Sequence, residues 1–183
     1  LYDPRYVAKV RGESVQETIA WLRYLGEQMT DILAETYPGA VVWQLFFEPW
    51  RCRYGGLMRS VNYICLGMLD RALQKGVRLK LIAGGEVAVG YYHATVGELS
   101  RALTAQQDGA AALREKYGDL FELGATIAPY ADAAKLTSWL RRRAGENPPL
   151  KKAADFVPFF RTLFKARRYV WLYCASAAAQ PGC

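Results

Sequence analysis

Two glutamates stand where a pair of carboxylates could carry out acid–base chemistry. Glu48 follows the apolar run 41–47, and Glu86 follows the apolar run 77–83 after two glycines. If both runs are neighbouring parallel strands, they lie about 4.8 Å apart. The two carboxyl groups could then meet within the roughly 5 to 9.5 Å that hydrolysis of a glycosidic bond uses. One group would protonate the leaving oxygen, and the other would attack the sugar carbon or activate water.

Each glutamate also has a structural interpretation. A carboxylate in a loop after a strand can cap the next helix or pair with a nearby cation. For Glu48 and Glu86 the nearby cations are Arg51 and Arg53. Loops that follow strands in parallel folds frequently carry function, which is the positional reason for considering a site here. Both interpretations stay open for the two carboxylates.

Aromatic side chains and a histidine occupy the loops after the same expected strands. Ring faces and tyrosine hydroxyls can hold a sugar, although large rings also fill protein cores. The single histidine, His93, lies seven residues after Glu86. It fits either a base oriented by that carboxylate or a solvated loop residue. The residues predicted to bind substrate are Trp50, Tyr91, Tyr92, His93, Tyr130 and Tyr173.

Helices and strands alternate along the chain in a way that would bring these loops together. Capping-box spacing at Ser14 and Glu17, and again at Thr95 and Glu98, indicates helix starts, and Gly76 indicates a helix end. Short β-branched and aromatic runs between the helices are typical of strands buried on both faces of a parallel sheet. We expect helices at 14–35, 60–75, 95–117, 131–143 and 153–165, and strands at 41–47, 77–83, 121–128 and 169–173.

The alternation predicts an α/β fold in which four parallel strands have helices outside them. An open doubly wound sheet is the main alternative, but no G-x-G-x-x-G follows a strand and opens a helix. Aromatic strand ends followed by long loops favour a barrel, and the 183 residues fall short of the roughly 250 of a complete one. We therefore expect a partial (half) parallel β/α barrel over residues 1–183, a single domain that is the carboxyl-terminal fragment of a TIM-barrel-like domain.

Composition argues against several other classes of protein. The net charge is +7, but the basic clusters fall beside helix ends, where cations favour the helix dipole, rather than on one nucleic-acid-binding face. No apolar run approaches the eighteen or so residues of a membrane span. The four cysteines form no C-x-x-C pair, and with one histidine they give no zinc pattern. The sequence therefore predicts no nucleic acid, membrane, metal or cofactor, and it leaves the compartment open.

The strand ends resemble those of glycoside-hydrolase-like TIM barrels, most closely poorly characterised bacterial members of that group. The resemblance rests on Phe-Phe-Glu-Pro-Trp at 46–50, Ala-Gly-Gly-Glu at 83–86, Gly-Tyr-Tyr-His at 90–93 and Tyr-Val-Trp-Leu-Tyr at 169–173. It implies a barrel that acts on carbohydrate or binds it. The best-known members carry their catalytic glutamates on the fourth and seventh strands, whereas Glu48 and Glu86 would follow the fifth and sixth. The expected seventh strand ends in Ala-Pro-Tyr, so an essential carboxylate would belong to the other half.

Two functions are therefore expected. The first is a glycoside-hydrolase-like protein that cleaves a glycosidic bond with Glu86 and Glu48. The alternative is a non-catalytic relative that binds carbohydrate or has a structural role. Because a half-barrel exposes two strand edges that invite pairing, we also expect a missing amino-terminal half, or self-association, to cover those edges.

Overall fold

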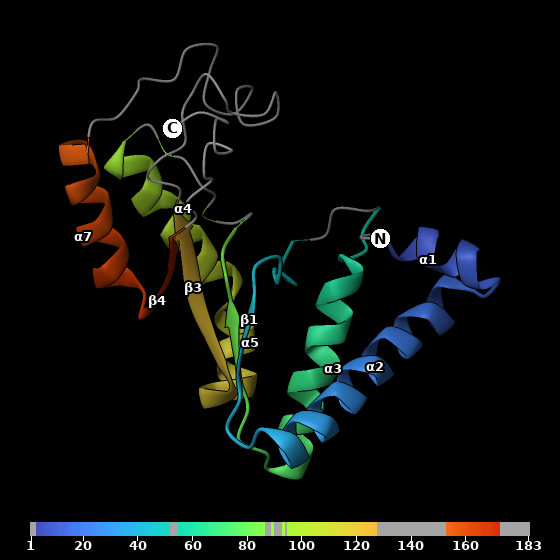
Figure 1. Ribbon diagram of the computed structural model, residues 1–183. Helices are drawn as coiled ribbons and strands as arrows, with labels where there is room; N and C mark the ends of the chain where they lie inside the picture. Colours follow the sequence, from blue (N-terminus) through green and yellow to red (C-terminus); the bar gives the residue numbers. More distant parts are fainter. Residues whose placement is uncertain are drawn as a thin grey trace, which may run out of the picture.

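The computed structural model describes residues 3–51, 55–86, 89, 93, 95–127 and 153–172. The strands are β1 (Val41–Gln44), β2 (Lys80–Ala83), β3 (Phe121–Ile127) and β4 (Tyr169–Leu172). They form one curled sheet in the order β1-β2-β3-β4, in which every neighbouring pair is parallel (Figure 1). The predicted α/β fold, a partial parallel β/α barrel, is confirmed.

Helices connect the strands and lie outside the sheet. They are α1 (Pro4–Arg11), α2 (Val15–Thr36), α3 (Ser60–Lys75), α4 (Val96–Gly109), α5 (Ala111–Tyr117) and α7 (Phe156–Ala166), with short 3-10 turns η1 (Gly118–Leu120) and η2 (Ala153–Asp155). The sequence did not predict α1, and the helix expected over 95–117 is two helices. The helix predicted at 131–143 lies outside the described residues. In the part of the chain that the structure describes, no helix is long and apolar enough to cross a membrane.

The predicted helix ends are confirmed by their hydrogen bonds. The Glu17 N–H donates to the Ser14 hydroxyl at 3.1 Å, and the Ser14 N–H donates to the Glu17 carboxylate at 2.8 Å, which closes a capping box. At the start of α4, the Glu98 N–H donates to the Thr95 hydroxyl at 3.1 Å. Gly76 ends α3 with a φ of 64°, a left-handed conformation that glycine adopts without strain.

Helices α2 and α3 come into backbone contact where two glycines meet. A Cβ atom added to Gly26 would lie 1.9 Å from the carbonyl oxygen of Ile64. A Cβ atom added to Gly67 would lie 2.0 Å from the carbonyl oxygen of Arg23. The backbones of the two helices therefore touch at Gly26 and Gly67, where any side chain would collide with the opposite helix.

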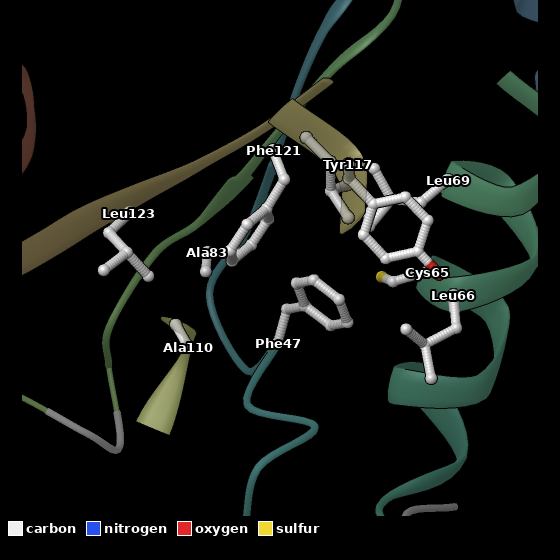
Figure 2. Close-up of a cluster of buried hydrophobic side chains, with 10 residues drawn as sticks. Phe47, Cys65, Leu66, Leu69, Ala83, Ala110, Tyr117, Phe121 and Leu123 are labelled. Atoms are coloured by element: carbon white, nitrogen blue, oxygen red, sulfur yellow. The ribbon is translucent and has the colours of Figure 1, made fainter. Parts of the chain in front are cut away.

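A hydrophobic cluster fills the space between the outer face of the sheet and helices α3 and α5 (Figure 2). The Phe47 ring lies inside it and meets the Phe121 ring edge-on, with 5.7 Å between the ring centroids. Burial raises the pKa of the Cys65 thiol to about 12, so this cysteine is a packing residue and not a nucleophile. The buried members are Phe47, Cys65, Leu66, Leu69, Leu81, Ala83, Ala110, Tyr117, Phe121 and Leu123.

The opposite face of the sheet is concave and carries aromatic rings. Side chains alternate between the two faces of a strand, and Val42 and Val170 pack with the clusters on the helix side. Trp43, Tyr169 and Trp171 therefore lie on the concave face. The Trp43 ring centroid is 5.9 Å from that of Tyr169 and 6.1 Å from that of Trp171. In a flat sheet, strands β1 and β4 would be about 14 Å apart, so this ring contact shows how strongly the sheet curls.

Two glycines make room for the Trp43 indole on the concave face. A Cβ atom at Gly84 would lie 2.4 Å from Nε1 of Trp43, and one at Gly124 would lie 3.1 Å from its Cζ2. The indole therefore lies over β2 and β3 and reaches toward the far edge of the sheet. Glycine at both positions is a requirement of this packing, because a methyl group at either would overlap or crowd the ring.

Candidate functional site

The segments that carry the two predicted catalytic carboxylates run side by side at the carboxyl ends of β1 and β2. The Gly84 N–H donates to the Gln44 carbonyl at 2.9 Å, and the Glu86 N–H donates to the Leu45 carbonyl at 3.2 Å. This adjacency follows from the parallel register, which pairs Gln44 with Ala83. The main chains of the two segments therefore meet at the edge of the sheet where parallel β/α folds carry their sites.

Glu48 is enclosed rather than open to this edge. The chain turns after Gln44, and the turn carries Phe47 into the helix-side cluster. Glu48 itself is 2% exposed. Its N–H donates to Oδ1 of Asn62 in the first turn of α3 at 3.1 Å, and its Oε2 is 3.8 Å from Nη1 of Arg51. The contact with Arg51 is the cation pairing that the structural interpretation of Glu48 expects.

Glu86 is only partly buried and lies in a tight turn. Gly85 has a φ of 73°, and a Cβ atom there would lie 2.9 Å from the carbonyl oxygen of Gly124, so the backbone passes directly over β3. The Val89 N–H donates to the Gly85 carbonyl at 2.9 Å. His93 is also partly buried, and its Nε2 hydrogen-bonds with the carbonyl oxygen of Val89. This hydrogen bond ties His93 to the turn that carries Glu86.

Trp50 packs against the helix layer. A Cβ atom added to Gly109, at the end of α4, would lie 2.6 Å from Cδ1 of Trp50. The partly buried indole borders the cluster that holds Phe47 and Ala110, so much of the ring serves packing. Of the other residues predicted to bind substrate, all but His93 lie outside the described residues: Tyr91, Tyr92, Tyr130 and Tyr173. Their role, like that of Trp50, stays a prediction.

The aromatic residues of the concave face were not among the predicted site residues. Trp171 is 41% exposed, and the buried Nε1–H of Trp43 has no hydrogen-bond partner among the described residues. On the same face, the Thr126 hydroxyl donates to the Gly84 carbonyl at 2.6 Å. The alternation of Trp43 with Val42, together with glycines on the neighbouring strands, was the sequence signal for this face.

A buried arginine, Arg167, lies just before β4 and bonds to Gln106, whose Nε2 would be 3.0 Å from a Cβ atom at Gly85. Arg167 donates from Nε and Nη2 to Oε1 of Gln106, at 3.0 and 2.9 Å, and from Nη2 to the Leu103 carbonyl at 2.8 Å. Gln106 in turn donates to the Gly124 carbonyl at 2.9 Å. Burial lowers the pKa of Arg167. The guanidinium thus ties α4, β3 and β4 together, which is a structural role.

Several other charged residues of the sheet and the helices form ion pairs. At the amino end of the concave face, Nζ of Lys80 is 3.1 Å from Oε2 of Glu122. On the helices, Asp70 lies 2.7 Å from Lys116 and 3.0 Å from Arg23. Among the described residues, no group of three or more histidines, cysteines and carboxylates could hold a metal ion.

The fold and these contacts define the chain as a partial parallel β/α barrel with one enclosed and one partly buried glutamate at its strand ends. No family model matches the chain, and no curated protein or solved structure is significantly similar to it.

Proposed function

We propose that the chain is part of a glycoside-hydrolase-like barrel. In this proposal Glu86 is a catalytic carboxylate and Glu48 has a structural role. The observation that supports this is the contrast between the two glutamates. Glu86 is only partly buried, in a turn at the carboxyl end of β2, whereas Glu48 is 2% exposed and lies beside Arg51 and Asn62. Catalysis at Glu86 would then need a partner carboxylate from outside this chain, because glycoside hydrolysis uses two.

A non-catalytic carbohydrate-binding barrel is the second candidate. It is favoured by the enclosure of Glu48, which leaves a single glutamate of the predicted pair in an accessible position. Aromatic rings bind sugars without any carboxylate, and Trp50 lies in the segment that follows β1.

Three glutamine variants in the protein that carries this chain test the proposal. Glu86→Gln removes the proposed acid–base group, and we expect kcat for hydrolysis of aryl glycosides and polysaccharides to fall by at least about a hundredfold. Glu48→Gln should lower the melting temperature and change kcat much less. Glu35→Gln, at an exposed position on α2, is the control and should change neither.

The results discriminate the two candidates. A folded Glu86→Gln variant with unchanged kcat would refute the catalytic assignment. Loss of kcat in a folded Glu48→Gln variant would show that the enclosed glutamate is the catalytic one. If the unmodified protein binds polysaccharide in affinity electrophoresis but hydrolyses none of the aryl glycosides and polysaccharides tested, the carbohydrate-binding function is favoured over the catalytic one.

A further inference from the structure

We propose that the two open edges of the half-barrel form one closure surface, and that it takes a second copy of this chain. Within the described residues, the sheet ends at β1 on one side and at β4 on the other, and both strands run in the same direction. A second copy rotated by half a turn about the sheet's curling axis would set its β4 beside β1 and its β1 beside β4. Both new pairs would be parallel, like every pair within the chain.

The backbone of β1 presents hydrogen-bonding groups to that edge. The carbonyl groups of Ala40 and Gln44 accept from Lys80 and Gly84 of the neighbouring chain segment, at 2.9 Å each. Because successive peptide groups of a strand point to opposite sides, those of Val41 and Trp43 face away from β2. They are a row of donors and acceptors of the kind that recruits another strand.

Helix α2 carries exposed apolar side chains. Among the described elements it packs mainly against α3 and α1, and Figure 1 shows it on the far side of α3 from most of the sheet. Met29 and Ile32 are exposed, and with Leu25 they follow the four- and three-residue spacing of one helix face. Val41, the first residue of β1, is 55% exposed. Within the described residues, β1 is therefore an edge strand with an exposed first residue, and α2 carries exposed apolar side chains.

The opposite edge has the same character. Trp171 and Leu172 of β4 are exposed, and so is Phe164 of α7. The Phe164 ring stacks on Phe160, with 6.2 Å between centroids and 21° between planes. In Figure 1, α7 and α2 lie at opposite extremes of the molecule, with the sheet between them. At this edge an exposed strand and an exposed ring of the contacting helix α7 therefore occur together.

Within strands β1 and β4 themselves, the residues that commonly block natural strand edges do not occur. Such edges are commonly blocked by lysine, proline or a bulge, but β1 reads Val-Val-Trp-Gln and β4 reads Tyr-Val-Trp-Leu. No charged side chain lies within either strand, so two copies can approach there despite the net charge of +7 on each.

The curl of the sheet limits the assembly to two copies. Edge-to-edge addition of a flat sheet would continue without end, whereas a strongly curled one can close. Trp43 of β1 and Tyr169 of β4 meet across the concave face, with ring centroids 5.9 Å apart, because the Trp43 side chain extends over β2 and β3 and the sheet curls toward it. Four strands make half of the eight-stranded barrel, and two identical halves complete it.

Sedimentation equilibrium of the chain over a wide concentration range tests the proposal. We expect a single species of twice the 20.5 kDa chain mass. Val41→Lys places a charge at the β1 edge and should raise the dimer dissociation constant at least about tenfold. Leu73→Lys is the matched control, because Leu73 is 49% exposed and belongs to helix α3, not to an edge strand. It should leave the dissociation constant unchanged.

Two further measurements keep the test decisive. Leu172→Lys charges the other edge and should weaken the dimer as Val41→Lys does, with far-UV circular dichroism confirming that each variant is folded. Amide exchange in 41–44 and 169–172 should slow as the dimer forms. The proposal would be overturned by a monomer at every concentration, or by equal weakening of the dimer by Leu73→Lys. It would also be overturned by a mass that rises without a plateau, which would indicate open association instead of closure.

Discussion

Replacing Gly67 by alanine places a methyl group directly against the backbone of α2. The added Cβ would lie 2.0 Å from the carbonyl oxygen of Arg23. A carbon and an oxygen in contact are at least about 3.3 Å apart, so the two helices would have to separate by roughly 1.3 Å. That shift would also stretch the buried hydrogen bond from the Thr30 hydroxyl to the Met68 carbonyl, which is 3.0 Å long.

The two energetic effects of this substitution oppose each other. Alanine is favoured over glycine in a helix by about 1 kcal/mol, and overpacking a well-packed contact costs about 1–3 kcal/mol, occasionally more. Because the colliding atom belongs to the backbone and cannot swing away, we place the overpacking at the upper end. The expected net loss in the free energy of unfolding is therefore about 2 kcal/mol.

Urea denaturation followed by far-UV circular dichroism measures this loss as a lower midpoint. Gly97→Ala is the matched control, since Gly97 lies in α4 and a Cβ there would be 3.7 Å from its nearest neighbour, the end of the Arg101 side chain. The control should be neutral or more stable by up to about 1 kcal/mol. If Gly67→Ala matched the control, the backbone contact between α2 and α3 would be wrong.

Two further predictions concern the concave face and acid stability. Gly124→Ala would bring a Cβ to 3.1 Å from the Trp43 ring and 3.0 Å from Ile82 Cγ2, and it should lower the free energy of unfolding by about 1–3 kcal/mol. In a Trp43→Leu background, Gly124→Ala should cost less, because the ring that it crowds is gone. An equal loss in both backgrounds would contradict this packing. Hydrogen bonds from Arg71 and Lys75 hold the pKa of the Asp31 carboxyl well below its ordinary value, so its stabilisation is present above the unfolded-state pKa of about 3.9 and declines as the pH falls below it. The stability difference between the unmodified chain and Asp31→Asn should therefore shrink on going from roughly pH 5 to pH 2, and a difference independent of pH would refute the ion-pair explanation.

The periodic parts of the fold could be predicted from the sequence because their signals are local. The apolar spacing of α2 runs along the helix itself. The Ser14–Glu17 capping box and the glycine after α3 lie within a few residues of the helix ends that they mark. Helix α1 had comparable signals, namely the Asp3 cap, Pro4 in the first turn and Gly12 after the last. It is only eight residues long and contains few apolar residues, so it has no long apolar stripe like that of α2, and it was missed for that reason.

The environment of Glu48 could not be predicted from the same kind of signal. Residues 41–47 are an almost unbroken apolar run, which does not reveal where pairing ends. In the structure β1 stops at Gln44, because Phe47 packs against Phe121 from a distant part of the chain. That long-range contact carries Glu48 to the first turn of α3. Likewise, the meeting of Trp43 with Tyr169 depends on the curl of the whole sheet.

The buried Arg167 has a consequence for the order in which the chain folds. Its guanidinium depends on Gln106, which is 61 residues earlier, and Gln106 is oriented by the Gly124 carbonyl. Burying this cation without these acceptors would cost free energy. Docking of the segment 153–172 is therefore not stabilised until α4 and β3 are assembled. Contacts of such long sequence separation form slowly. We expect β4 to be the last strand to join the sheet, in a single cooperative step with α7.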